Sequence, residues 1–285
     1  MSEGAAQSPL AAAYERAAEV VQTSDRDRYI ADLFAPEPFR RHLFALHAFN
    51  AEVARVRDVV SDPMLGEIRL QWWRDAITNG AAGGHPVAMA LNATIAKFKL
   101  PKAAFIRLID ARLFDLYDDP MPGINDLEGY AGDTSSSLIQ LAAIVLANGQ
   151  DPGTAEAAGH GGVAYALLGI MRALPVHARR GQLFLPMSMI ATRGLDTRGL
   201  FAGKTSPELK TLLADLRTIA RQHLAETERD IADLTPPVKA AFLPLALVRP
   251  YLERMERADF DPFAGAVELP AWRRQWLLWR AARRM

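Results

Sequence analysis

The chain has 285 residues, half of them hydrophobic, no cysteine, and 33 basic residues balanced by 33 acidic ones. The zero net charge provides no overall field that would attract nucleic acid, and the lack of cysteine excludes disulfides, thiolate nucleophiles and zinc–thiolate sites. A chain of this size and composition can bury a substantial core, and because a cysteine-free protein fits a reducing compartment, we expect it to be cytoplasmic.

The N-terminus, MSEGAAQSPLAAAYERAAEVVQ, lacks the basic start and apolar run of a secretory signal. Nowhere does the chain have an uninterrupted apolar run of ~20 residues, the length that spans a bilayer. We therefore expect a protein that is neither secreted nor integral to a membrane.

Apolar residues recur at spacings of three and four along most of the chain, whereas the alternation typical of strands is scarce. This pattern predicts an all-α protein. The Pro-Gly segment 118–126 is interpreted as a loop, so we expect a single domain. Ser206-Pro207-Glu208 is a helix start signal. In chain order, the predicted helices cover residues 10–22, 25–34, 37–60, 64–80, 86–97, 101–117, 125–147, 153–174, 206–232, 236–256 and 270–283.

The stretch RYIADLFAPEPFRRHLFALHAFNAEVARVRD, followed by EIRLQWWRDAI, resembles the squalene and phytoene synthase family. The resemblance implies a single-domain isoprenoid (terpenoid) synthase-type helical bundle, in which two aspartate-rich helices hold magnesium ions against prenyl diphosphates in a central cavity. It also predicts a division into an N-terminal helical extension at 1–24, a synthase-like domain at 25–260, and a basic, Trp-rich amphipathic helix at 261–285.

The first aspartate motif of the family is altered in this chain. When the motif is set on His47-Ala48-Phe49, its two aspartates fall at Ala54 and Asp58, so the first carboxylate is missing. Asp62 restores a four-residue spacing with Asp58, and two carboxylates on one helix face could chelate Mg²⁺. However, Pro63 biases Asp62 away from helical geometry. The alternative is a solvated or ion-paired helix end, with Arg55, Arg57 and Arg69 as available partners.

The second aspartate motif is missing. The run RRGQLFLP, Arg179 to Pro186, is similar to the signature that follows it in the family, and counting back places the expected carboxylates at Ala173, Val176 and His177. No Asp or Glu occurs between Glu156 and Asp196. Because hard cations need oxygen ligands, we expect no metal or other cofactor unless Asp58 and Asp62 hold Mg²⁺.

Two groups of residues are candidates for ligand binding. Arg69, Trp73 and Arg74 belong to the part of the family pattern that is retained, which indicates either a retained ligand cavity or ordinary core packing. The second group is basic and could bind a phosphorylated lipid or an acidic partner surface. Its alternative role is surface charge at a helix end. This second group comprises Arg172, His177, Arg179 and Arg180.

The C-terminal run ELPAWRRQWLLWRAARRM spaces three tryptophans along one helix among arginines. This is the pattern of a basic amphipathic helix at a membrane surface, which would make the protein peripheral on the inner face of the cytoplasmic membrane. The alternative is packing of the tryptophans against the bundle. The expected membrane contacts are Trp272, Trp276, Trp279, Arg273 and Arg280.

The runs AFNAEVARVRDVVSDPMLGEIRLQWWRDAI and GIMRALPVHARRGQLFLP are similar to the branch of the family represented by complex I assembly factor 6, which lacks the aspartate motifs. This resemblance implies a non-catalytic protein that assists assembly of respiratory complex I and binds one of its subunits or assembly intermediates. The first alternative is an active prenyltransferase of the squalene or phytoene synthase type, with Asp58 and Asp62 as Mg²⁺ ligands. The second is a carrier of a phosphorylated lipid.

Overall fold

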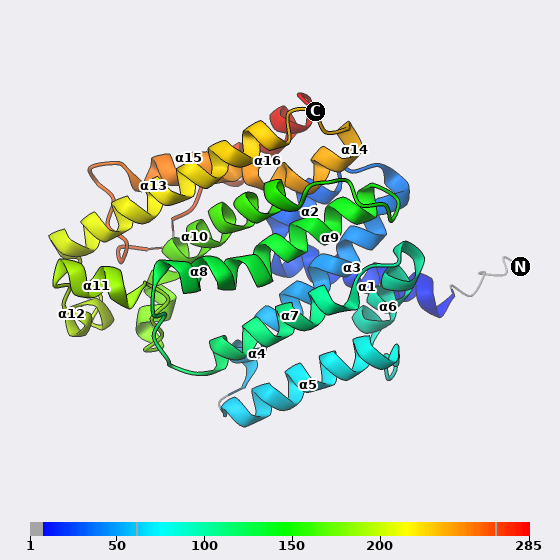
Figure 1. The fold of residues 1–285 in the computed structure, drawn as a ribbon, viewed down its shortest axis with the longest axis horizontal. Coiled ribbons are helices and arrows are strands. Elements are labelled where there is room, and N and C mark those ends of the chain that lie inside the picture. Colours follow the sequence, from blue (N-terminus) through cyan, green and yellow to red (C-terminus); the bar gives the residue numbers. More distant parts are fainter. Residues whose placement is uncertain (1–7, 61, 266) are drawn as a thin grey trace, which may run out of the picture. The chain divides into compact units, whose positions relative to one another are not determined.

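All regular structure in the described part of the chain, residues 8–60, 62–265 and 267–285 of a computed structural model, is helical (Figure 1). The all-α prediction is therefore confirmed. Contacts between residues divide the chain into two compact units. Unit 1 comprises residues 1–116, 141–152 and 236–241, and unit 2 comprises 117–140, 153–235 and 242–285. The boundaries predicted after residues 24 and 260 stay a prediction.

The helices of the two units follow one another along the chain as Figure 1 labels them. Unit 1 contains α1 Pro9–Ser24, α2 Arg26–Asp32, α3 Glu37–Ala54, α4 Val56–Val59, α5 Pro63–Asn79, α6 Pro86–Phe98, α7 Lys102–Leu113, η1 Phe114–Leu116 and α14 Pro236–Lys239. Unit 2 contains α8 Ile124–Ala131, η2 Gly132–Ser136, α10 Ala155–Arg179, α11 Met187–Arg193, α12 Thr197–Phe201, α13 Pro207–Asp230, α15 Val248–Met255 and α16 Ala271–Ala282. Two elements, α9 Ser137–Leu146 and η3 Ala240–Leu247, carry the chain between the units.

In unit 1, α1 packs against α3 and α6, and α5 packs against α7. Helix α1 begins at Pro9 because the Ser8 hydroxyl accepts a hydrogen bond from the Ala11 amide at 3.2 Å. Its apolar stripe, which includes Ala13, Ala17 and Val21, is buried. Spacings of three and four residues place these side chains on one face, which is why the sequence predicts this helix.

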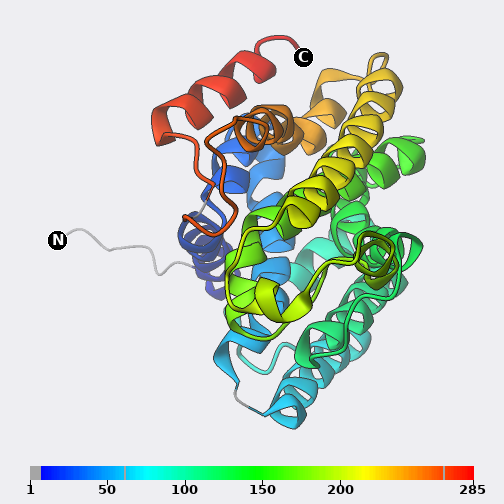
Figure 2. The same cartoon turned by 90° about the vertical axis from the view of Figure 1, so that its left-hand side faces the viewer.

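In unit 2, α10 and α13 run alongside each other, as Figure 2 shows. The predicted start of α13 is confirmed, because the Ser206 hydroxyl accepts a hydrogen bond from the Leu209 amide at 3.2 Å. Leu209, Leu212 and Leu216 are then buried in turn along the helix. Truncation of such a leucine to alanine typically costs about 2–5 kcal/mol of stability, so this stripe determines the position of α13.

The long helix predicted over residues 37–60 is wrong, since it is interrupted at Arg55. There α3 ends and the short helix α4 begins, with Arg55 at φ −88°, ψ 0°. Helix α4 ends at Val59, and Asp62 is extended at φ −108°, ψ 124° before α5 begins at Pro63. The expected effect of Pro63 on Asp62 is therefore confirmed.

The helix predicted over residues 125–147 contains a π-helical turn, η2. This turn lies against Gly162 of α10, and a methyl group at Gly162 would overlap the Ser136 backbone. The Ser136 hydroxyl donates to the Gly159 carbonyl at 2.9 Å, which secures the contact. The close approach of two backbones therefore depends on the missing side chain of Gly162.

Helices α11 and α12 were not predicted from the sequence. They are only 7 and 5 residues long, so the apolar period has little length in which to show itself. Local signals are nevertheless present. Gly194 ends α11 in the left-handed region at φ 62°, and the Asp196 carboxylate accepts from the Arg198 and Gly199 amides to begin α12.

Among the described helices, only α10 is long and apolar enough to cross a membrane. However, 61% of its most apolar window is buried inside the protein. Its neighbours include α13, η2 and α15 of the same unit. These are the surroundings of a core helix.

Candidate functional site

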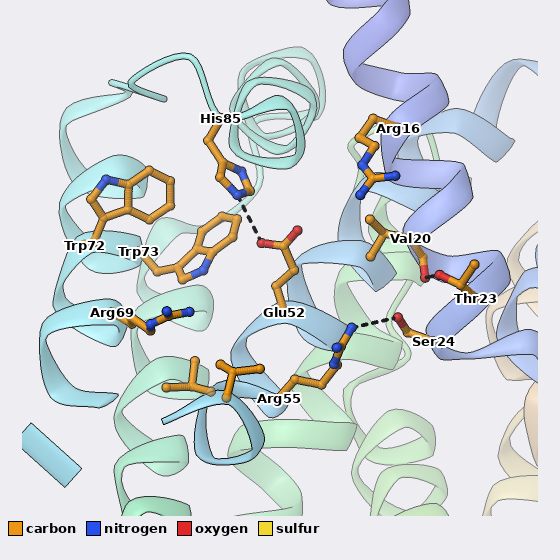
Figure 3. A pocket seen from close by; sticks show the side chains of 12 residues that line it. Arg16, Val20, Thr23, Ser24, Glu52, Arg55, Arg69, Trp72, Trp73 and His85 are labelled. Carbon is orange, nitrogen blue, oxygen red and sulfur yellow. Dashed lines mark hydrogen bonds and ion pairs between the residues drawn. The ribbon is translucent and has the colours of Figure 1, made fainter. Parts of the chain in front are cut away.

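A pocket in unit 1 combines cationic, aromatic and titratable side chains, and its volume is about 410 Å³ (Figure 3). Pockets of this size accommodate small organic ligands. Helices α1, α3, α4 and α5 and the residue before α6 contribute its walls. The lining residues are Arg16, Val20, Thr23, Ser24, Glu52, Arg55, Val56, Val59, Arg69, Trp72, Trp73 and His85.

Helix α5 supplies one wall of the pocket. Because residues three and four positions apart share a helix face, Arg69 lies on the same face as Trp72 and Trp73. The Trp73 ring is buried against Phe49, with ring centroids 5.2 Å apart, whereas Trp72 is 37% exposed. The tryptophan pair therefore joins the core to the pocket wall. Core packing accounts for Trp73, and ligand binding at this wall stays a prediction.

His85 closes the pocket from the start of α6. Its Nδ1 accepts a hydrogen bond from the Ala88 amide at 3.4 Å, and the ring packs against Trp72 and Trp73 at centroid distances of 5.1 and 5.4 Å. Because Nδ1 is an acceptor, the proton of the neutral ring lies on Nε2. Burial lowers the pKa of His85, which keeps this ring neutral.

The Glu52 carboxylate faces that ring, with 3.3 Å between Glu52 Oε2 and His85 Nε2 (Figure 3). Burial raises the pKa of the Glu52 carboxyl to about 7, although Arg16 and Arg55 act in the opposite direction. Glu52 is thus a carboxyl group that changes its charge near neutral pH.

Three guanidinium groups line the pocket, and they differ in their hydrogen-bond and ion-pair partners. Arg16 forms an ion pair with Glu19 at 2.9 Å, and Arg55 donates to the Ser24 hydroxyl at 3.5 Å. Arg69 has no hydrogen-bond or ion-pair partner within the described ranges. Figure 3 shows it extending into the pocket beneath Trp73.

The structure places the predicted unit 1 residues in two locations. Arg69 and Trp73 meet in the pocket just described. Arg74 instead forms an ion pair with Asp110 of α7 and lines a separate hollow beside Glu67 and Ile109. Arg74 is therefore not part of the pocket.

Asp58 and Asp62 do not form the chelating pair that a continuous helix would give. Asp58 lies on α4, whereas Asp62 precedes α5 and caps it by accepting from the Met64 amide at 2.9 Å. Across the described ranges, no group of three or more His, Cys, Asp or Glu side chains is arranged to hold a metal ion. Since magnesium requires several oxygen ligands, the residues at the expected positions do not fit it.

In unit 2, the predicted basic residues are spread along the end of α10. Arg172 donates to Glu268 at 2.9 Å, and its guanidinium lies 4.1 Å from the Tyr251 ring centroid. His177 packs on Phe184 with ring centroids 4.5 Å apart. Arg179 and Arg180 are exposed where the helix ends, and ligand binding by this group stays a prediction.

The C-terminal helix α16, the red helix in Figure 2, keeps its tryptophans at the surface. Trp272, Trp276 and Trp279 are 69%, 46% and 47% exposed. Leu278 is fully buried and anchors the opposite face. All three tryptophans therefore keep a large part of their surface exposed, and their contact with a membrane stays a prediction.

Several polar groups were missed by sequence reasoning. Glu52 and His85 are 33 residues apart, and no local pattern links them. His160 Nδ1 lies 2.8 Å from Nδ1 of His223, and His223 in turn reaches Glu128 at 3.4 Å. The sequence indicates only on which face of its helix each of these residues lies. Which helix packs against that face depends on the three-dimensional structure.

Comparison with known proteins identifies the class. The family model for squalene/phytoene synthase matches residues 21–280, and the chain belongs to that family. The crystal structure of a dehydrosqualene synthase in complex with ligand matches with a TM-score of 0.80 at 18% identity, covering 96% of each chain. The fold is therefore the isoprenoid synthase helical fold.

Within the family, the chain is similar to proteins named NADH dehydrogenase (ubiquinone) complex I, assembly factor 6. The Rattus norvegicus protein is 31% identical over 253 residues, and the Homo sapiens protein is 31% identical over 255 residues. Each alignment covers 88% of this chain and 76% of the relative. The resemblance to that branch is confirmed.

Proposed function

We propose that this protein assists the assembly of respiratory complex I, the NADH:quinone oxidoreductase, without transferring prenyl groups. The similarity to the assembly factor 6 proteins, at 31% identity over most of the chain, is the observation that carries the proposal. A complex I subunit or assembly intermediate is the partner in this role.

The altered aspartate motifs support the non-catalytic part of the proposal. Ionisation of an allylic diphosphate leaves a strongly charged group, which this class of chemistry stabilises with carboxylate-held metal ions. Of the positions that the family motifs imply, Asp58 alone keeps a carboxylate, since Ala54, Ala173, Val176 and His177 replace the others.

The exposed face of α16 supports a position at the membrane that contains complex I. The helix has no acidic residue, and its arginines accompany three exposed tryptophans. Tryptophan side chains partition into the interfacial region of bilayers, and arginines are attracted to anionic lipids. In this proposal, the protein binds the inner face of the cytoplasmic membrane through α16.

The test is the NADH:quinone oxidoreductase activity of membranes from cells deleted for this gene. The cells are complemented with the wild type or with Asp58→Asn/Asp62→Asn. Asparagine is chosen because it preserves the cap of α5 while removing both charges. Succinate:quinone oxidoreductase activity in the same membranes is the control for general membrane damage.

We expect deletion to remove the NADH-linked activity selectively and both complementing genes to restore it. Unchanged activity after deletion would contradict the assembly role. Failure of the asparagine variant alone, at wild-type protein level, would contradict the non-catalytic role and favour prenyl transfer.

A further inference from the structure

We propose that the unit 1 pocket binds a small organic ligand that carries a single oxyanion group on an apolar body, with Arg69 holding the oxyanion and Trp72 and Trp73 contacting the body. This inference is independent of the assembly role, because it rests only on the side chains of this pocket.

The Arg69 guanidinium, whose N–H donors have no partner among the described residues, indicates an oxyanion ligand. A guanidinium presents five N–H donors, and its planar fork matches a carboxylate or phosphate. Arg16 and Arg55 already have Glu19 and Ser24 as partners, whereas Arg69 has none in the part of the chain that the structure describes. One unsatisfied guanidinium therefore matches one oxyanion group.

The apolar side chains that line the pocket point to the apolar body. Val56 and Val59 line the same pocket as Trp72 and Trp73. Trp72 remains 37% exposed although Trp73 and His85 pack against it. A ligand lying on this ring would remove apolar surface from water, which is favourable in proportion to the area covered.

Glu52 makes the pocket sensitive to pH. The groups that surround it are Arg16 from α1, Arg55 from the end of α3, Arg69 from α5, and His85 before α6. An ionised Glu52 repels an anionic ligand and competes for the arginines, whereas a neutral Glu52 leaves the ligand as the anionic partner for Arg69 and for Arg55, which contacts only a neutral hydroxyl. The ligand should therefore bind more tightly as the pH falls through the range in which Glu52 takes up its proton.

The experiment is a calorimetric titration of the full-length protein with decanoate and with decyl phosphate, below their micellar concentrations. Decyltrimethylammonium, which has the same tail and the opposite charge, is the control ligand. Arg69→Gln is compared with Arg26→Gln, since Arg26 is an exposed arginine of unit 1 that does not line the pocket. Circular dichroism establishes that both variants are folded.

We expect the anions to bind and the cation not to bind. Loss of the Arg69 charge should weaken anion binding about tenfold or more, since a charge-assisted bidentate contact disappears. Arg26→Gln should bind like the wild type. Binding of only the carboxylate, or only the phosphate, also supports the site and identifies the head group.

Decanoate also measures the pH dependence, because its carboxylate remains ionised from pH 6.5 to pH 8. If the ligand binds only the form with neutral Glu52, its affinity should be about eightfold higher at pH 6.5 than at pH 8. In Glu52→Gln the affinity should not change with pH. Absence of anion binding, equal binding of the cation, or equal affinity in Arg69→Gln would overturn the proposal.

Discussion

Lys97 Nζ lies 3.1 Å from His42 Nε2, on the edge of the unit 1 core. A lysine ammonium can only donate, so Nε2 accepts, and the ring proton lies on Nδ1. Nδ1 in turn reaches the Thr94 hydroxyl at 2.9 Å and the Tyr14 hydroxyl at 3.1 Å. This network requires a neutral imidazole, and the pKa of His42 is lowered to about 4, first by burial and then by the Lys97 and Arg41 charges.

His42 should make the protein less stable in mild acid. In the unfolded chain the imidazole takes up its proton near pH 6.5, whereas in the folded state it does so only near pH 4. Between these values the unfolded state binds more protons, so the free energy of unfolding falls as the pH decreases. The loss approaches about 3 kcal/mol for this group. Urea denaturation of the wild type and of His42→Gln measures it, and an equal pH dependence in both proteins would contradict this role.

Glu52 should have the opposite effect at higher pH. Its folded-state pKa of about 7 lies above the ordinary value of 4.5, so the folded protein binds more protons between these values. The free energy of unfolding therefore falls as the pH rises through this window. Glu52→Gln should be more stable than the wild type at pH 8 by about 1–3 kcal/mol and equally stable at pH 4. Thermal denaturation at the two pH values measures this difference. If Glu52→Gln is less stable than the wild type at pH 8, ionised Glu52 does not destabilise the folded protein.

The contact between α10 and η2 predicts a severe effect of a single methyl group. Gly162→Ala forces the Ser136 backbone to move, which should cost about 1–3 kcal/mol or more of stability. Gly169→Ala is the matched control, because it lies on the same helix and nothing stands within 4 Å of the added methyl group. That control should be neutral or stabilising by up to about 1 kcal/mol. Similar changes in the free energy of unfolding for the two variants would mean that the η2 backbone moves away from the added methyl group without loss of stability.

The tryptophans of α16 should control membrane binding. Trp272→Ala/Trp276→Ala/Trp279→Ala should bind vesicles of phosphatidylglycerol and phosphatidylcholine about tenfold or more weakly in cosedimentation, because three interfacial anchors are lost. Since these side chains are exposed, the melting temperature should change little. Arg273→Gln/Arg280→Gln should also weaken binding and reduce its dependence on salt. If the wild type does not bind these vesicles, or if the tryptophan variant binds equally well, α16 is not the membrane contact.

Sequence reasoning succeeded where a local signal determines the structure. Ser206 caps α13 through its own hydroxyl, and Pro63 restricts the residue before it, so both could be predicted from neighbouring residues. It failed at η2 and at the pocket. The π-helical turn accompanies the close approach of Gly162, and Glu52 meets His85 only because α3 and α6 pack together. Such contacts arise from packing between distant segments and leave no local pattern.

The discontinuous composition of unit 1 has a consequence for the order of events during synthesis. The chain emerges from the ribosome with its N-terminus first, yet unit 1 includes residues 141–152 and 236–241. Its own set of contacts is therefore incomplete until more than four-fifths of the 285 residues have been translated. Domains generally fold as units in the order in which they emerge, but here neither unit can finish early. The nascent chain must keep partly covered apolar helices in solution for most of its translation.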